Sequence, residues 1–338
     1  MRSPLFLQKL ISRPEFGPLI LLLAEIVIFT ALAPAFLSAL NIGNSLAFTP
    51  ELGIIALGMT LLMTSGEFDL SVGSVFGLAP VIMWTIYNAG TVSIEDGVRV
   101  GTTTLEGGFV AALLISALIG FVNGWMVTKL RIPSFLVTLG MLLVARGTAL
   151  YITDGFPQRT WTAESPLMDI IVGDFYIGEL RIYASLLWFI VLALILGYVL
   201  TQSKLGNWIQ AAGGNPGAAL ARGVRVNQTK IALFILTAVL SAYAGITSSI
   251  RVAGANPNSG TGYELEVIAM VVIGGTALSG GRGTIIGTVL GVFILRLMRN
   301  GIVMVGVPGL AYNIFIGAII LGMMALHSWL ERRHHSGI

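Results

Sequence analysis

The chain has 338 residues, of which 55% are hydrophobic and only 10% are charged, and its mean hydropathy is +0.89. Soluble domains carry about 25% charged residues, so this chain lacks the charge to cover a water-facing surface, and a soluble enzyme is excluded. The net charge of +3 is the charge expected of loops beside a membrane, so we expect the lipid bilayer, and not nucleic acid, as the surrounding partner. The composition predicts an all-α polytopic membrane protein with a single transmembrane domain over residues 1–338.

Ten apolar stretches have the length and the boundaries of membrane helices. They cover residues 18–36, 45–64, 70–90, 107–128, 133–153, 181–201, 229–251, 265–279, 284–300 and 308–329. The first stretch is followed by no Ala-x-Ala cleavage site, so we interpret it as a helix and not as a signal peptide. The eighth is short and ends at the Gly-rich segment 279–283, so we expect it to be broken or to cross the membrane incompletely.

The basic residues orient these helices. With both termini in the cytoplasm, twelve of the 19 basic residues lie inside: Arg2, Lys9, Arg13, Lys129, Arg131, Lys204, Arg222, Arg225, Lys230, Arg282, Arg332 and Arg333. Six lie outside, namely Arg99, Arg159, Arg181, Arg251, Arg296 and Arg299, and Arg146 lies within a span. This excess of inside charge is the expected bias. Arg296 and Arg299 are the exceptions near the outer end of the ninth span, where we expect them to snorkel or to face protein.

Two loops are long enough for a role of their own. The outer loop, residues 154–180, carries five acids and one base, and it is long enough to fold over a pore mouth. The inner loop, residues 202–228, has three bases and no acid, and it is the largest feature predicted in the cytoplasm. Within it, Asn215 and Pro216 can end one element and begin a short helix, with Ala218 and Ala219 as a flat face for docking. Simple solvated loops are the alternative for both.

No catalytic motif is present. None of the four lysines belongs to a phosphate-binding loop, and the glycines at 281, 283 and 287 have the wrong spacing for a dinucleotide, so we expect no enzyme activity and no ATP site in this chain. The absence of cysteine excludes disulfides and thiolate metal sites. The three histidines, His327, His334 and His335, are interpreted as part of a solvated tail, and we expect no metal.

Ionisable residues inside the spans are few, which disfavours a proton- or sodium-coupled carrier. Glu25, Glu51 and Arg146 are the candidates, and we consider Arg146 a partner for either glutamate in a buried ion pair. Asp69 is interpreted first as an N-cap of the third helix, with a substrate ligand as the alternative.

Three segments together resemble the sugar-importing ABC permeases of the ribose, xylose and arabinose type. The first runs from Gly66 to Ser74, where the family commonly reads G-G-I-D-L-S-V-G-S. The second is Ala211–Pro216 followed by Ala218–Gly223, which resembles the cytoplasmic loop of the family. The third runs from Glu264 through Gly283 to Thr288. Their order and spacing extend the resemblance over nearly the whole chain.

The resemblance implies a permease of about ten helices with the vitamin B12-importer (type II) fold, in a bacterial inner membrane. It implies a cytoplasmic ABC ATPase that holds ATP and Mg²⁺, a periplasmic sugar-binding protein, and a second permease that is either an identical copy or a homologue. The ATPase would act on the coupling loop, whose residues include Gly213, Gly214, Asn215, Pro216, Ala218, Ala219, Arg222 and Gly223. One residue departs from the family pattern, because Glu67 replaces a glycine; it either reshapes the inner end of the pathway or faces the cytoplasm without effect.

A pathway for a neutral monosaccharide, polyol or furanosyl compound is expected to be lined by hydroxyls and amides. The candidates are Asn44, Thr60, Thr64, Asp69, Ser71, Ser74, Asn123, Ser134 and Thr276, although such groups also join helices by hydrogen bonds. A secondary active transporter, and a permease for amino acids or nucleosides, are the alternative functions.

Overall fold

The computed structural model describes residues 15–88, 93–95, 98–100, 104–159, 165–318 and 321–322. The helices are α2 (Phe16–Leu32), η1 (Pro34–Leu37), α3 (Ala39–Thr64), α4 (Val72–Asn88), α5 (Leu105–Lys129), α6 (Ser134–Ile152), α7 (Pro166–Val172), α8 (Ala184–Gln202), α9 (Lys204–Gly214), α10 (Pro216–Ala221), α11 (Val226–Val252), α12 (Tyr263–Ile273), α13 (Ile285–Met304) and η2 (Gly309–Ala311). The last helical turn η2 opens a short apolar helix, Gly309–Ala318.

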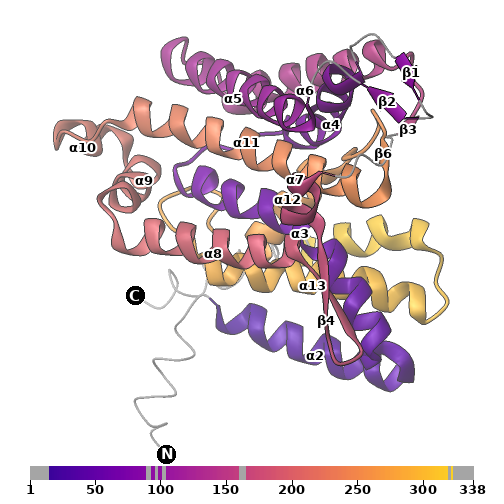
Figure 1. Ribbon diagram of the computed structural model, residues 1–338. Coiled ribbons are helices and arrows are strands. Elements are labelled where there is room, and N and C mark those ends of the chain that lie inside the picture. The colour runs from indigo at the N-terminus through magenta and orange to yellow at the C-terminus, as the bar shows by residue number, and fades with distance from the viewer. Residues whose placement is uncertain are drawn as a thin grey trace, which may run out of the picture.

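Three short antiparallel pairs supplement the helices. The strands are β1 (Ser93–Glu95), β2 (Val98–Val100), β3 (Gln158–Arg159), β4 (Asp174–Ile177), β5 (Leu180–Tyr183) and β6 (Gly254–Ala255). They pair as β1–β2, β3–β6 and β4–β5. Most of them lie at one end of the helix bundle, and α9 and α10 lie at the opposite end (Figure 1).

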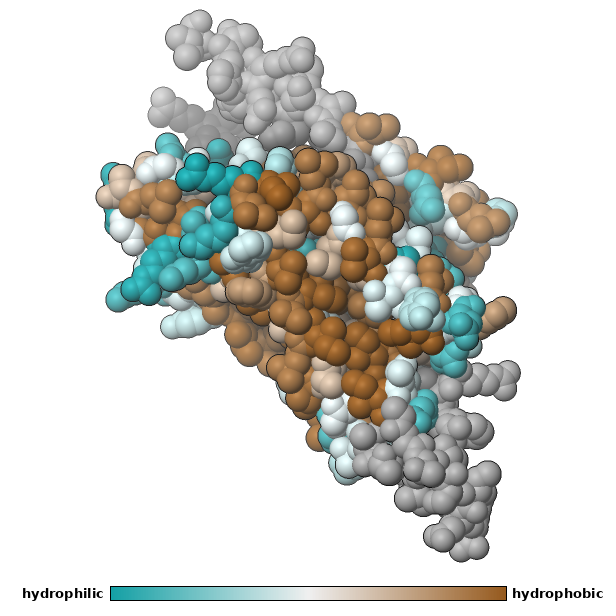
Figure 2. All heavy atoms as spheres, turned by 90° about the horizontal axis from the view of Figure 1, so that it is seen from above, coloured by the Kyte–Doolittle hydropathy of each residue, from teal (hydrophilic) through white to brown (hydrophobic). Residues whose placement is uncertain are grey.

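Helix α3 forms the centre of the molecule. It is 89% buried over its most apolar window, whereas α5, α6 and α8 are 22–28% buried and α11 and α13 are 61% buried. The outer helices therefore surround α3 and present apolar side chains outwards. Figure 2 shows these hydrophobic side chains over the face of the molecule that α5 and α6 cover. Six helices, α3, α5, α6, α8, α11 and α13, are long and apolar enough to cross a membrane, so the chain is a multi-pass membrane protein.

Helices α5 and α11 pack closely against each other. Gly120 and Gly124 stand four residues apart on α5, and a Cβ on either would come within 2.8 Å of the α11 backbone at Phe234 or Ile231. Small residues at this spacing allow two membrane helices to approach through their backbones. A larger side chain at either position would force the two helices apart.

Each of the ten predicted spans contains a helix, with ends shifted by several residues. The eighth span was predicted to reach residue 279, but α12 ends at Ile273, because Gly274 and Gly275 follow it and Gly275 has φ +94°. The expectation of a short, interrupted eighth span is thus confirmed. Of the tenth span, the structure describes residues 308–318 and 321–322.

The two predicted loops contain regular structure. The inner segment 202–228 holds α9 and α10, and the described part of the outer segment 154–180 holds β3, α7 and β4. The β4–β5 hairpin is closed by an ion pair of 2.8 Å between Arg181 and Asp174, and this guanidinium lowers the pKa of the Asp174 carboxyl below its usual range. Arg2, Lys9, Arg13, Arg332, Arg333, His327, His334 and His335 lie outside the described residues.

Candidate functional site

The three sequence motifs meet at one place, where the C-terminal end of α3 touches α9 and the segment between α12 and α13. The amide N of Gly281 donates a hydrogen bond of 2.8 Å to the carbonyl oxygen of Thr64. Gly66, Gly213 and Gly280 approach one another through their backbones at the same point. We call Gly66, Gly213, Gly280 and Gly281 the glycine junction.

Side chains do not fit at the glycine junction. A Cβ on Gly213 would overlap the carbonyl oxygen of Thr64 and lie 2.6 Å from the N of Gly281. A Cβ on Gly280 would lie 2.8 Å from the Cα of Gly66, and both residues have left-handed backbones, at φ +79° and +85°. Because only glycine allows such an approach and such dihedrals, these positions depend on this residue type. The junction therefore joins α9 to the central helix α3 through backbone contacts alone.

Two side-chain caps position the segment beyond the junction. The hydroxyl of Ser203 accepts a hydrogen bond of 3.1 Å from the N of Gly206 and begins α9. The Oδ1 of Asn215 accepts a hydrogen bond of 3.0 Å from the N of Ala218, and Pro216 occupies the first turn of α10. The predicted short helix after Asn215 is confirmed.

Most of the predicted coupling residues are exposed, whereas Gly213 is half-buried and Ala219 is buried. Those that are exposed are Gly214, Asn215, Pro216, Ala218, Arg222 and Gly223. Ala219 is buried against Ala212 and Val226 whereas Ala218 is exposed, so the two do not form the predicted flat face: successive residues of a helix point in directions about 100° apart. The surface that α10 offers to a partner therefore includes Ala218 but not Ala219.

Asp69, Ser71 and Asn123 form one buried polar cluster. The Oδ1 of Asp69 accepts hydrogen bonds from the N and the Oγ of Ser71, at 2.7 and 2.6 Å. The Nδ2 of Asn123 on α5 donates to the Oγ of Ser71 at 3.1 Å and to the Oδ2 of Asp69 at 3.4 Å. Asp69 thus holds the turn that leads into α4, but its carboxylate accepts from Ser71, the residue before the helix, so it stands two residues ahead of the predicted N-cap position. The Oδ1 of Asn123 has no hydrogen-bond partner among the described residues.

The other pathway candidates lie at different places in the bundle. Thr60 and Thr64 bond to carbonyls one turn earlier on α3, and Thr60 also bonds to Thr288 of α13 at 2.6 Å. Asn44 is exposed, Ser134 is buried at the start of α6, and Ser74 is buried without a hydrogen-bond partner among the described residues. Thr276 is buried beside Gly283, where a Cβ on the glycine would lie 3.3 Å from the Cγ2 of Thr276 and would overlap the hydroxyl of Thr64. The hydroxyl of Thr276 has no hydrogen-bond partner among the described residues. Thr60 therefore joins α3 to α13, whereas the hydroxyl of Thr64 bonds within its own helix.

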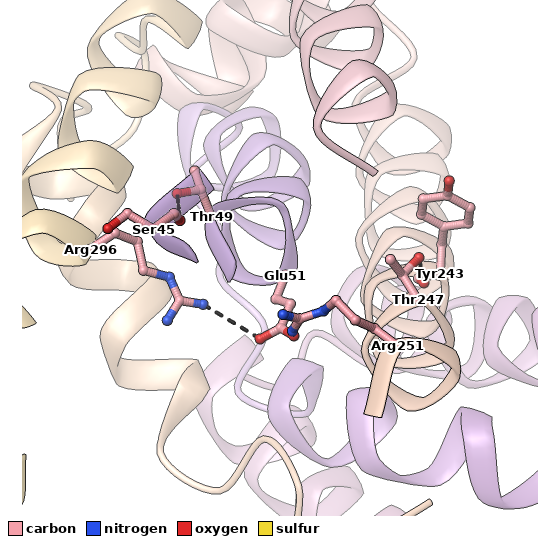
Figure 3. Close-up of polar contacts among 7 residues, drawn as sticks. All are labelled: Ser45, Thr49, Glu51, Tyr243, Thr247, Arg251 and Arg296. Atoms are coloured by element: carbon pink, nitrogen blue, oxygen red, sulfur yellow. Dashed lines mark hydrogen bonds and ion pairs between the residues drawn. The ribbon is translucent and has the colours of Figure 1, made fainter. Parts of the chain in front are cut away.

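A second polar site, which the sequence reasoning missed, lies inside the bundle between α3, α11 and α13. Figure 3 shows Glu51 of α3 between Arg251 of α11 and Arg296 of α13. Its Oε1 accepts a hydrogen bond from Arg251, and its Oε2 lies 3.7 Å from the guanidinium of Arg296. All three side chains are at most 9% exposed. Arg251 also stacks over the ring of Phe48 at 3.9 Å.

Arg251, predicted at the outer end of the seventh span, is buried inside the bundle at the end of α11. It ends the apolar run of α11, and a terminal base in such a run is typical of a loop boundary, whereas here it folds back onto Glu51. Arg296 faces protein, which is one of the two alternatives expected for it. Arg299 is exposed, and its guanidinium lies 5.0 Å from the ring centre of Tyr312. A glutamate within a predicted span was the one available signal of this site.

Arg146 has a different role from the predicted ion pair. Its guanidinium donates to the carbonyl oxygens of Pro257 at 2.5 Å, Ser259 at 2.7 Å and Gly73 at 3.2 Å. The prediction that it pairs with Glu25 or Glu51 is wrong, because Glu51 is held by the two arginines above and Glu25 has no described hydrogen-bond partner. Arg146 instead fixes the connection between α11 and α12 onto α4.

We expect Arg146→Gln to lower the free energy of unfolding by about 1.5–3 kcal/mol, because charged hydrogen bonds to buried carbonyls are lost. Thermal denaturation of the purified chain in detergent measures the change. Arg222→Gln, at an exposed position, is the matched control and should leave the midpoint unchanged. Equal midpoints for the two variants would contradict this role of Arg146.

Glu67, the residue that departs from the motif, pairs with Lys230 of α11. The two charged groups are 2.6 Å apart, and their side chains are 16% and 12% exposed. Glu67 therefore forms an ion pair with the first turns of α11 and is not a carboxylate without a partner. Among the residues that the structure describes, no group of three or more His, Asp or Glu side chains could hold a metal ion.

Comparison with known proteins gives one family. The model of the branched-chain amino acid transport system / permease component family matches residues 41–324. The ribose import permease protein of Escherichia coli K12 is 37% identical over 92% of both chains, and that of Bacillus subtilis 168 is 34% identical over 91% of this chain and 90% of the relative. The xylose/arabinose import permease protein of Sulfolobus acidocaldarius is 33% identical over 88% of this chain and 80% of the relative. No solved structure matches.

Proposed function

This chain belongs to the family of branched-chain amino acid transport system permease components, and we propose that it is the membrane subunit of an ATP-driven ABC importer for a monosaccharide or a related polyol or furanosyl compound. The relatives that support the sugar class are named as ribose and xylose/arabinose import permeases. The observation that carries the proposal is the glycine junction, which connects a short exposed helix, α10, to the central helix α3.

The proposed assembly needs three partners. ATP and Mg²⁺ would be held by a cytoplasmic ATPase, the sugar would be delivered by a periplasmic binding protein, and a second permease, identical or homologous, would complete the pathway. The proposed topology has about ten crossings, the vitamin B12-importer fold and both termini in the cytoplasm of a bacterial inner membrane. The basic residues around α9 and α10 support this orientation.

The junction suggests how ATP would drive the pathway. When ATP draws the ATPase subunits together, α10 and α9 move with them. Since α9 touches Thr64 and Gly281 through backbone atoms, there is no flexible side chain to absorb the movement, and the inner ends of α3 and of the segment before α13 follow. ATP and the loaded binding protein would thus bias the same two-state bundle from opposite faces.

We expect Arg222→Glu to reduce copurification of the ATPase by roughly tenfold or more, because it reverses an exposed charge at the end of α10. Lys204→Glu is the control, since it reverses an exposed base of the same segment outside α10. Pull-down of the complex from membranes gives the readout. Equal loss in both variants would show a general charge effect and not a contact at α10.

The function itself is tested with the complex in lipid nanodiscs. Its ATP hydrolysis is measured with candidate binding proteins, each loaded with a sugar, an amino acid or a nucleoside. Stimulation by one sugar-loaded binding protein is the expected result. Stimulation only by an amino acid-loaded or nucleoside-loaded protein would replace the substrate class, and uptake that persists without ATP while a proton gradient is present would indicate a secondary transporter.

A further inference from the structure

A cavity of about 660 Å³ opens beside α10, between the end of α5, the start of α6 and the start of α11. Its wall carries three bases, Lys129, Arg131 and Lys230, and one acid, Glu67. The acid is already used by Lys230, at 2.6 Å, whereas none of the ion pairs among the described residues includes Lys129 or Arg131. The cavity therefore has an excess of two positive charges.

The remaining wall of this cavity is mostly apolar, with Thr128 and Asn227 as its polar members. Val127, Ile132 and Pro133 line it from α5 and α6, and Leu220 and Val226 line it from α10 and α11. Helix α5, whose end forms part of the wall, is among the helices that present apolar side chains outwards (Figure 2). A ligand that suits both surfaces has an anionic head and an apolar body.

The backbone at Arg131 is a second observation. Arg131 follows the C-cap of α5 and has φ +57°, a left-handed conformation that glycine or asparagine usually supplies at a helix end. The chain thus holds an arginine where glycine would be less strained, and this arginine reaches the cavity. Strain of this kind is found where a side chain is needed for binding.

We infer that this cavity binds the phosphate of an anionic phospholipid headgroup, with Lys129 and Arg131 as its two free bases. Basic pockets between membrane helices bind such headgroups, because two or more positive charges meet the phosphate at the membrane surface. Glu67 limits the affinity, since it neutralises Lys230 and places a carboxylate in the same wall. Because Leu220 of α10 forms part of the wall, a bound lipid would touch the helix that we assign to coupling.

Native mass spectrometry of the purified chain tests this inference. The chain in detergent is titrated with phosphatidylglycerol or with phosphatidylcholine, and the bound lipid is counted. The variant Lys129→Gln with Arg131→Gly removes both free bases; Lys129 and Arg131 are exposed, and glycine suits the backbone at 131, so the fold is retained. The matched control, Lys204→Gln with Arg222→Gln, removes two exposed bases of the neighbouring segment outside the cavity.

We expect the cavity variant to bind phosphatidylglycerol at least roughly tenfold more weakly, the control to bind as the wild type does, and Glu67→Gln to bind several-fold more tightly. Phosphatidylcholine should show no such dependence. Equal binding of the two lipids by the wild type, or equal loss in the cavity variant and the control, would overturn the inference. Inorganic phosphate is added in a separate arm, and displacement of phosphatidylglycerol by an equal concentration of phosphate would overturn the assignment to a lipid by showing that a free anion occupies the cavity.

Discussion

Gly213→Ala is expected to destabilise the chain and abolish sugar uptake, whereas Gly214→Ala, one residue further along α9, is expected to do neither. A Cβ at 213 would overlap the carbonyl oxygen of Thr64, and Thr64 and Gly281 are joined there by a backbone hydrogen bond. A Cβ at 214 has one neighbour, the Cα of Gly281, at the ordinary distance of 3.8 Å.

The two alanine variants differ in packing and not in backbone conformation, since both residues lie in α9 without a positive φ. Alanine gains about 0.5–1 kcal/mol over glycine inside a helix, and overpacking costs about 1–3 kcal/mol. The denaturation midpoint should therefore fall in Gly213→Ala and stay equal or rise in Gly214→Ala. Equal midpoints and equal uptake in the two variants would show that the junction is not a close contact.

Glu51→Gln is expected to have the second large effect, a loss of about 3–5 kcal/mol in the free energy of unfolding. The substitution removes the negative charge between Arg251 and Arg296 and leaves two buried guanidinium groups without an anion. Thermal denaturation in detergent measures the loss.

The chain offers a matched control for Glu51 at the other buried glutamate of the N-terminal helices. Glu25 of α2 is 8% exposed, and neither of its carboxylate oxygens has a described hydrogen-bond partner. Glu25→Gln replaces a buried carboxyl that has no described cation beside it, so stability should be unchanged or increased. A larger loss in Glu25→Gln than in Glu51→Gln would contradict the ion cluster shown in Figure 3.

The sequence predicted the helices well, because a membrane span is set by local hydropathy. It also predicted the start of α10, since Asn215 and Pro216 are a local cap signal. It did not predict the glycine junction, although the glycines were all within the motifs. The contacts of Gly213 with Thr64 and Gly281 join residues far apart in the chain, and nothing in either segment identifies the other.

The polar candidates show a second limit of the sequence. A threonine in a membrane helix can satisfy its hydroxyl on its own backbone, as Thr60 and Thr64 do, so its polarity does not reveal whether it faces a pathway or a neighbour. Charged residues were misjudged for a related reason. Arg251 and Arg146 are long enough to reach partners on other helices, and their sequence positions indicate only where their Cα atoms lie.

The coupling proposed for the glycine junction is tested most directly by the ratio of sugar transported to ATP hydrolysed. The complete importer is reconstituted in proteoliposomes with the wild type, Gly213→Ala or Gly214→Ala, and uptake and hydrolysis are measured in the same vesicles. Our account expects Gly213→Ala to retain ATP hydrolysis while its transport ratio falls to near zero, and Gly214→Ala to keep the wild-type ratio. An unchanged ratio in a folded Gly213→Ala complex would contradict the glycine junction as the element through which ATP drives transport.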